Sequence, residues 1–210
     1  LVRLRELMEE GKIRNVPIYA DSPMALKALA FYRDAIDKHS PEIRDDIAET
    51  WQGRDPFDPG QLVELMTVEE SKSINTPPQP SIIISASGMA TGGRVVHHLR
   101  GMLPNPKHTV VLVGYQAVGT RGRNLIEGAK EVKMHGEMVP VEAQISSIQE
   151  FSVHADGNEL LQWLGVAKDR IKKVFVIHGE EGAQDAVVKR VEDELHVSAV
   201  APSDAQHFAL

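Results

Sequence analysis

The sequence of 210 residues contains no cysteine. This absence excludes a disulfide framework, a zinc site with cysteine ligands and a cysteine nucleophile. Long hydrophobic runs are also missing, because apolar stretches such as 82–84 and 174–177 have only the length of a strand and fall far short of a membrane span. The first residues are rich in Arg and Glu, so we expect no signal peptide. The sequence therefore predicts a protein of a reducing compartment, the cytoplasm, with no membrane partner.

Positive charge is in the minority, with 23 Lys and Arg residues against 30 Asp and Glu residues and a formal net charge of −7. This balance disfavours a protein that binds nucleic acid over its whole surface, because such binding requires an excess of Lys and Arg to neutralise phosphates. It is compatible with a local basic groove, since one site can carry the opposite sign from the whole chain. The length is enough for one large domain or two small ones.

Strand and helix patterns alternate along the chain, delimited by apolar spacing, caps and breaks at glycine or proline. Ser22 and Pro23, for example, are typical of a helix start. Helices are predicted over 1–11, 23–32, 41–52, 94–102, 122–128, 157–167 and 182–195, and strands over 16–20, 81–85, 109–113, 173–177, 197–201 and 207–210. These repeated strand–loop–helix units predict an α/β fold with a largely parallel sheet. A meander of two or three strands over 131–148 departs from this pattern and indicates a change of domain.

Two histidines occupy positions suited to chemistry. His154 lies just before the helix predicted from 157, and His178 ends the strand predicted over 173–177. Ligands bind at the carboxyl ends of strands in α/β sheets, and imidazole is both a common metal ligand and a proton carrier near neutral pH. The alternative is that His154 is a cap or loop residue and His178 a hydrogen-bonded strand end. The remaining histidines are interpreted as structural or solvent-facing: His39, His97, His98, His108, His135, His196 and His207.

Two glycine-rich turns, 85–93 and 119–123, each join a strand to a helix. Backbone N–H groups at a helix start and the planar guanidinium of arginine both suit phosphate oxygens. Neither turn contains Gly-Lys-Ser/Thr or the Gly-x-Gly-x-x-Gly spacing of a dinucleotide site. The alternative is a pair of tight turns with surface arginines. The candidate phosphate contacts are Ser87, Gly88, Thr91, Gly92, Gly93, Arg94, Thr120, Arg121 and Arg123.

Three carboxylates have candidate supporting roles. Asp21 follows the first predicted strand, where a helix-capping residue is the alternative interpretation. Asp156 and Glu180 each lie two residues after His154 or His178, where they are placed to orient an imidazole. The sequence contains neither His-x-His-x-Asp-His nor His-Glu-x-x-His, and a catalytic zinc ion normally has three protein ligands. From its residues alone, the chain is interpreted as an anion-binding α/β module with half of a metal site.

Five blocks of sequence, in order, resemble the β-CASP family of metallo-β-lactamase-fold nucleases. The resemblance is strongest to the bacterial and archaeal RNA-processing members, relatives of the eukaryotic pre-mRNA 3′-end endonuclease subunit. The blocks are 21–25, 85–94, 113–120, 151–156 and 176–180. The resemblance implies that residues 1–149 form most of a β-CASP domain, with a parallel sheet flanked by helices. Residues 150–210 would then be the returning C-terminal segment of the metallo-β-lactamase fold.

The resemblance also implies roles for two residues. His154 matches the family's motif B histidine, which approaches the scissile phosphate and helps to protonate the leaving oxygen. His178 matches the motif C histidine, which ligates one of two zinc ions. RNA-cleaving members have histidine at that position, whereas DNA-repair members have an apolar residue. The implied function is therefore that of a zinc-dependent ribonuclease with RNA as its substrate.

The family's main metal-binding block, its later His and Asp ligands and its motif A acid all precede the β-CASP insertion, and none is in this sequence, which starts at Leu1. We therefore expect the chain to be the C-terminal part of a longer nuclease, inactive without the N-terminal metallo-β-lactamase portion. The alternative function is a non-catalytic module, related to these nucleases, that binds RNA or another protein. The sequence does not decide whether the protein is a homodimer, which RNA it cleaves, or whether it cleaves internally or from an end.

Overall fold

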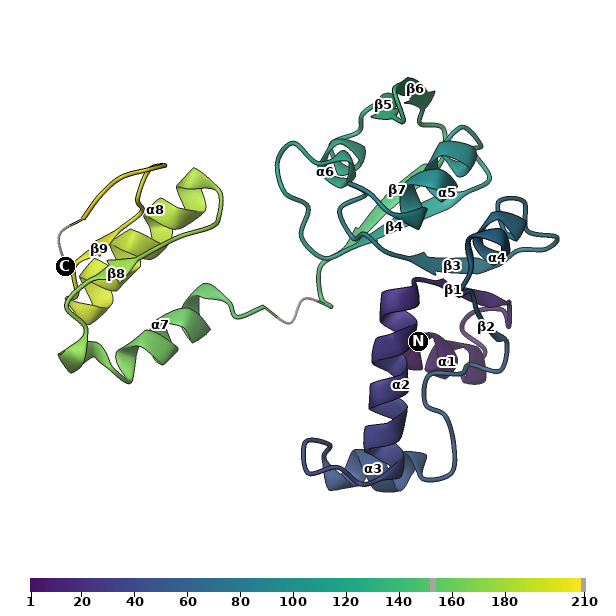
Figure 1. Cartoon of the computed structure of the whole chain (residues 1–210), viewed down its shortest axis with the longest axis horizontal. Coiled ribbons are helices and arrows are strands. Elements are labelled where there is room, and N and C mark those ends of the chain that lie inside the picture. The colour runs from purple at the N-terminus through teal and green to yellow at the C-terminus, as the bar shows by residue number, and fades with distance from the viewer. Residues whose placement is uncertain (152–153, 209–210) are drawn as a thin grey trace. The chain divides into compact units, whose positions relative to one another are not determined.

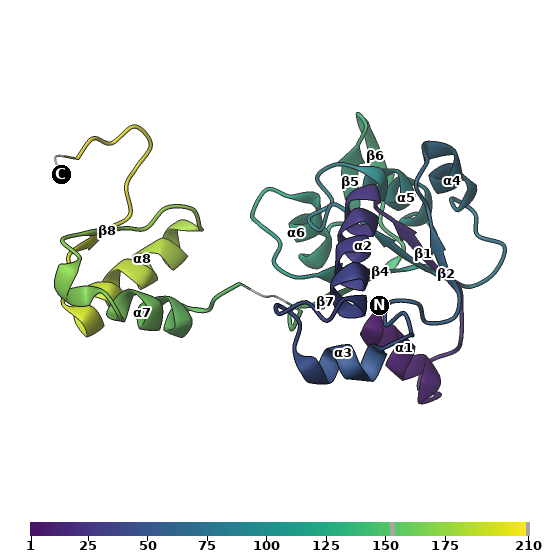
Figure 2. The same cartoon turned by 60° about the horizontal axis from the view of Figure 1, so that its bottom comes forward.

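A computed structural model describes residues 1–151 and 154–208. The chain divides into two compact units, Leu1–Glu150 and Phe151–Leu210. Figures 1 and 2 show a mixed first unit of helices and short strands, and a second unit in which α7 and α8 lie side by side. Among the described residues, no helix is both long and apolar enough to cross a membrane.

A three-stranded parallel sheet forms the first part of the larger unit, in the order β2-β1-β3. Strand β1 (Ile18–Asp21) lies at its centre with a strand on each side, and three of its four residues are buried. Four helices accompany this sheet, and Figures 1 and 2 show α3 lying across the C-terminal end of α2. The bounds are β2 (Leu62–Glu64), β3 (Ile82–Ser85), α1 (Val2–Glu9), α2 (Pro23–Asp37), α3 (Asp45–Trp51) and α4 (Val68–Ser73).

The remainder of this unit contains a parallel strand pair and an antiparallel hairpin. Strand β4 (Thr109–Val113) pairs with β7 (Gln144–Ile148), and the hairpin consists of β5 (Glu131–Met134) and β6 (Glu137–Pro140). Helices α5 (Arg94–Met102) and α6 (Arg121–Ile126) complete it. Its apolar core is formed by Leu103, Leu125, Met134 and their neighbours, which are almost wholly buried.

The second unit is small. Its parallel pair consists of β8 (Val174–Phe175) and β9 (Ala199–Val200), and its helices are α7 (Gly157–Gly165) and α8 (Glu181–Arg190). A 3₁₀ turn covers Lys168–Arg170 and a π-helical turn covers Val191–Leu195. The core is correspondingly modest, centred on Val191, Val197 and Ala199.

The expected α/β fold with parallel strands is confirmed, but four local predictions are wrong. The last strand of the predicted meander, β7, pairs in parallel with β4 and not with the hairpin. The strands predicted over 173–177 and 197–201 have only two residues each. The helix predicted over 182–195 is present, with a π-helical turn at its end. Residues 207–208 are not a strand, while 209–210 lie outside the described residues. The β-CASP and lactamase-fold assignments of 1–149 and 150–210 stay predictions.

Candidate functional site

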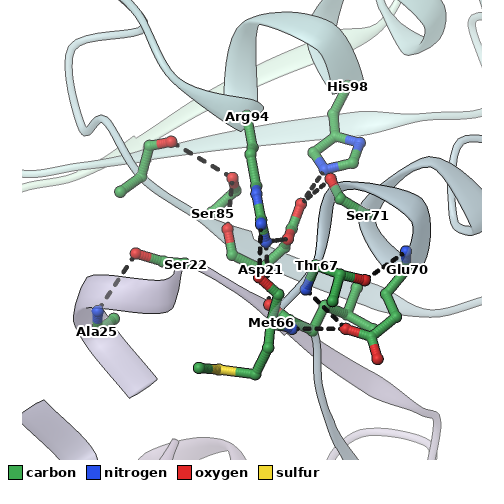
Figure 3. A network of polar contacts seen from close by, with 12 residues as sticks. Asp21, Ser22, Ala25, Met66, Thr67, Glu70, Ser71, Ser85, Arg94 and His98 are labelled. Atoms are coloured by element: carbon green, nitrogen blue, oxygen red, sulfur yellow. Dashed lines mark hydrogen bonds and ion pairs between the residues drawn. The ribbon is translucent and has the colours of Figure 1, made fainter. Parts of the chain in front are cut away.

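A buried carboxylate, Asp21, connects three elements of the first unit (Figure 3). It ends β1 with 1% of its surface exposed. The guanidinium of Arg94 donates from Nη1 to Oδ1 at 2.6 Å, and the hydroxyl of Ser71 donates to Oδ2 at 2.6 Å. His98 Nε2 lies 2.6 Å from the same Oδ2, and its Nδ1 lies 3.2 Å from Asn75 Oδ1. Asp21 therefore ties the end of β1 to α4 and α5.

Burial by itself would raise the pKa of Asp21. The hydrogen bonds from Ser71, His98 and Arg94, together with the positive charge of Arg94, outweigh it and hold the pKa below its ordinary value of 3.8. An ionised carboxylate only accepts hydrogen bonds, so Nε2 of His98 carries the hydrogen in this contact. The interpretation of Asp21 as a helix cap is wrong, because Ser22 is the cap of α2 and accepts from the N–H of Ala25 at 3.3 Å.

Arg94 is the first residue of α5, and its guanidinium has backbone partners as well as Asp21. It donates to the carbonyl oxygens of Leu65 at 3.0 Å and Met66 at 2.8 Å, just after β2. Its side chain is 20% exposed. The structure thus places the predicted phosphate-binding arginine at the start of α5, with its donors directed at protein acceptors.

The two predicted glycine-rich turns contact each other directly. Arg121, at the start of α6, donates to the carbonyl oxygens of Ala90 at 3.1 Å and Thr91 at 3.0 Å. The N–H of Gly122 donates to Met89 O at 3.0 Å, and the side-chain amide of Gln116 donates to Gly88 O at 3.0 Å. The two predicted anion loops, residues 85–93 and 119–123, therefore pack together, and we call them the glycine-rich assembly.

Two positions of this assembly, Gly93 and Gly122, have no room for a larger side chain. Gly93 has φ of +75°, and a Cβ there would lie 3.1 Å from the carbonyl oxygen of Ala86. A Cβ on Gly122 would lie 1.7 Å from Oε1 of Gln116, which is buried. Both positions require glycine for the turns to pack.

The remaining candidates in these turns have short-range partners. Ser87 and Thr91 place their hydroxyl oxygens 3.1 Å apart. Thr120 caps α6 by accepting from the N–H of Arg123, and it donates to Ala117 O at 2.7 Å. Arg123 pairs with Glu127 at 2.5 Å along the same helix. Phosphate contact by these residues stays a prediction.

A hollow of about 890 Å³ lies beside the glycine-rich assembly. Its lining comes from α4, from residues 91–97 at the start of α5, and from the hairpin of β5 and β6, where it includes Lys133 and His135. The rings of His97 and His135 stack within it, with their centroids 4.6 Å apart. The sequence pattern does not predict this hollow, because it predicts neither α4 nor β2. The Thr-x-x-Glu capping box at Thr67 and Glu70 was the available signal for α4.

His154 and His178 both lie in the second unit, and both are exposed. His178 follows β8 in a turn with φ of +65°, and Gly179 continues it with φ of +136°. Asp156 caps α7, accepting from the N–H groups of Asn158 at 2.7 Å and Glu159 at 2.9 Å. Glu180 is the residue before α8 and makes no side-chain cap there.

Metal-ligand donors do not gather within the described part of the chain: no group of three or more His, Asp or Glu residues there is placed to hold an ion. A zinc ion normally needs three or four protein ligands. The described residues therefore do not fit a complete zinc site, and His178 is at most one ligand of such a site.

Comparison with known proteins identifies the class of protein. Residues 1–125 match the family model described as the Beta-Casp domain, and residues 138–202 match the Zn-dependent metallo-hydrolase RNA specificity domain. Because the first match covers more than half of the chain, the chain belongs to the β-CASP family. The predicted resemblance is confirmed.

Individual relatives come from bacteria and archaea. The protein Ribonuclease TTHA0252 of Thermus thermophilus is 38% identical over 170 residues, which are 81% of this chain and 38% of the relative. The RNase J-like protein of Methanocaldococcus jannaschii is 36% identical over 180 residues, or 86% of this chain and 39% of the relative. The transcription termination factor FttA of Methanosarcina mazei is 31% identical over 188 residues, or 87% of this chain and 29% of the relative. The chain thus spans two fifths or less of the length of these relatives.

Proposed function

We propose that this chain forms part of a metal-dependent ribonuclease that hydrolyses RNA phosphodiester bonds. The observation that carries the proposal is the order of two family matches along one chain, a Beta-Casp domain followed by an RNA specificity domain of Zn-dependent metallo-hydrolases. Relatives named as a ribonuclease and an RNase J-like protein support the same activity.

The two exposed histidines have distinct roles in this proposal. His178, in the turn after β8, is one ligand of a zinc ion whose other ligands come from outside these 210 residues. His154 donates a proton to the leaving oxygen of the cleaved phosphodiester. Imidazole suits that step because it exchanges a proton near neutral pH, and the exposure of His154 leaves it open to a substrate.

The glycine-rich assembly contacts the RNA backbone in this proposal. Backbone N–H groups of residues 87–93 face the phosphate, as they do at many helix starts. Arg121 holds this loop in shape by donating to the carbonyl oxygens of Ala90 and Thr91. Arg94, directly after the loop, donates to the carbonyl oxygens of Leu65 and Met66 after β2. Asp156 orients α7 directly after His154 by capping it.

The test uses the full-length gene product with a single-stranded RNA substrate. His178→Ala should lose bound zinc and cleavage together, whereas His154→Ala should keep its zinc and lose cleavage rate. His207→Ala is the matched control, because His207 is also an exposed histidine of the second unit. Unchanged zinc content and rate in both site variants would contradict these roles.

The chain of 210 residues should not cleave RNA by itself. A single histidine ligand does not retain zinc with useful affinity. Zinc-dependent cleavage by the purified 210-residue chain would overturn this expectation. RNA binding without cleavage by the full-length product would favour the alternative, a non-catalytic RNA-binding module.

A further inference from the structure

The hollow beside the glycine-rich assembly is lined by basic side chains from four separate segments. We call it the basic hollow and define it by Lys72 of α4, His97 of α5, Arg121 of α6, and Lys133 and His135 of the hairpin. No Asp or Glu side chain lines it within the part of the chain that the structure describes. This composition contrasts with the net charge of −7 for the whole chain.

Two carboxylates on the elements that line the basic hollow, Glu70 and Glu137, have other partners. Glu70 accepts from the backbone N–H groups of Met66 and Thr67, both at 2.8 Å. Glu137 pairs with Arg100 at 2.5 Å. Because these carboxylates already have donors, they are poorly placed to neutralise the lysines that line the hollow.

Among the Lys and Arg side chains that line the basic hollow, Lys72, Lys133 and Arg121 keep a positive charge that no carboxylate of the described residues offsets. Arg94 also reaches the hollow, but the ion pair with Asp21 offsets its charge. Arg121 donates to the carbonyl oxygens of residues 90, 91 and 133, which satisfy its N–H groups without cancelling its charge. Within the described residues, no ion pair joins Lys72 or Lys133 to a carboxylate. The hollow therefore offers positive charge to an anion.

The stacked histidines add hydrogen-bonding groups to the same wall. His97 comes from α5 and His135 from the turn between β5 and β6, and their rings lie at 25° to each other. A neutral imidazole still carries one N–H donor, so each ring can bind a phosphate oxygen at neutral pH. At about 890 Å³, the hollow is as large as the sites that bind small molecules and far exceeds a single phosphate ion.

We propose that the basic hollow binds phosphate groups of an RNA strand, with Lys72 and Lys133 as the main charged contacts. The identity of the strand as RNA rests on the proposed function, whereas the preference for phosphate rests on the lining residues themselves. These contacts lie outside the glycine-rich loop and belong to binding, not to cleavage.

The test measures equilibrium binding of a fluorescent single-stranded RNA to the full-length protein without added metal, over a range of salt concentrations. Lys72→Ala combined with Lys133→Ala removes two positive charges from the hollow. Lys107→Ala combined with Lys130→Ala removes the same charge from exposed positions outside the lining of the hollow and is the matched control. Thermal unfolding of each variant shows that it is folded.

The expected result follows from counterion release. Each lost phosphate contact lowers the slope of log K against log salt by about 0.7 for a single strand, so the hollow variant should lose about 1.4 from the slope. At 0.1 M salt this corresponds to about 25-fold weaker binding. The control pair should change the slope by less than half as much. In nuclear magnetic resonance spectra, RNA should shift the ring signals of His97 and His135.

Equal effects of the two double variants would show that only net charge matters and would overturn the proposal. RNA affinity unchanged in the hollow variant, with inorganic phosphate still shifting the His97 ring signal, would show a small-anion site and would also overturn it. These readouts involve neither zinc nor cleavage. A failure of the proposed ribonuclease activity is therefore distinguishable from a failure of this site.

Discussion

Replacing Asp21 by asparagine tests whether the buried carboxylate holds the first unit together. Asn has the same shape but no charge, and its amide nitrogen is a donor that would face other donors. In the native protein, Arg94, Ser71 and His98 all direct donors at the two oxygens of Asp21, each at 2.6 Å. Asp21→Asn therefore removes the counter-charge of Arg94 and leaves at least one buried donor without an acceptor.

The magnitude can be estimated from burial. Removing one partner of a buried ion pair costs about 3–5 kcal/mol. Asp21 has no exposed side-chain surface but Arg94 is 20% exposed, so water compensates part of the lost pairing and the lower end applies. We expect the free energy of unfolding of the first unit to fall by about 3 kcal/mol. Ser71→Ala, which removes one neutral donor to the same carboxylate, should cost about 1.5 kcal/mol and serves if Asp21→Asn does not fold.

Urea unfolding followed by tryptophan fluorescence measures this loss. The chain has two tryptophans, Trp51 in the first unit and Trp163, which is 73% exposed, in the second. A Trp163→Phe background therefore makes Trp51 the reporter of the first unit. With a slope of about 2 kcal/mol per molar urea, the midpoint should fall by about 1.5 M. Asp37→Asn, on the exposed side of α2, should change it little. A midpoint for Asp21→Asn within about 0.25 M of the parent would refute the reasoning.

Three further predictions concern pH, a glycine and a helix cap. Because the folded-state pKa of Asp21 lies below 3.8, its stabilisation is complete above that value and is lost as pH falls through the folded pKa. The midpoint difference between parent and Asp21→Asn should thus shrink in urea titrations below about pH 4, and a constant difference down to about pH 2 would contradict this. Gly122→Ala should destabilise the first unit by about 1–3 kcal/mol, because its Cβ would overlap Oε1 of Gln116 at 1.7 Å. Gly101→Ala, in open space on α5, should be neutral or stabilising by up to about 1 kcal/mol in the same assay, and equal effects would disprove the clash. Asp156→Ala should lower the stability of the second unit by about 1 kcal/mol, seen by circular dichroism, and no loss would contradict its capping role.

Caps and apolar patterns in the sequence predicted the helices and strands whose limits are set by neighbouring residues. Ser22 before Pro23 marks the start of α2 correctly, and the apolar pattern over 109–113 matches β4. Strand β2 has only three residues, which is too short for a strand to be recognised from apolar periodicity. The length of β8 was overestimated because an apolar run does not show where its partner strand ends.

The candidate site was predictable only in part, for a related reason. Asp21 was recognised as a polar residue at a strand end, but its partners come from positions 50 to 77 residues away. His98 lies four residues after Arg94 and so shares a face of α5 with it, which was a usable clue. The acceptors of Arg94 and Arg121 are backbone carbonyl oxygens, and these have no signature in a sequence.

The two charged clusters of the first unit have separable roles, because only one of them has its charge offset. Asp21 and Arg94 form an ion pair, so their contribution to the field in the basic hollow is small and their main effect is on geometry. Lys72 and Lys133 have no such partner among the described residues, so their effect on an anion is electrostatic and depends on salt. Asp21→Asn should therefore lower stability and leave the salt slope of RNA binding no smaller. Replacing Lys72 and Lys133 should lower the salt slope of RNA binding and leave stability unchanged. A loss of slope in Asp21→Asn, with the lysines intact, would show that geometry and charge at this site cannot be separated.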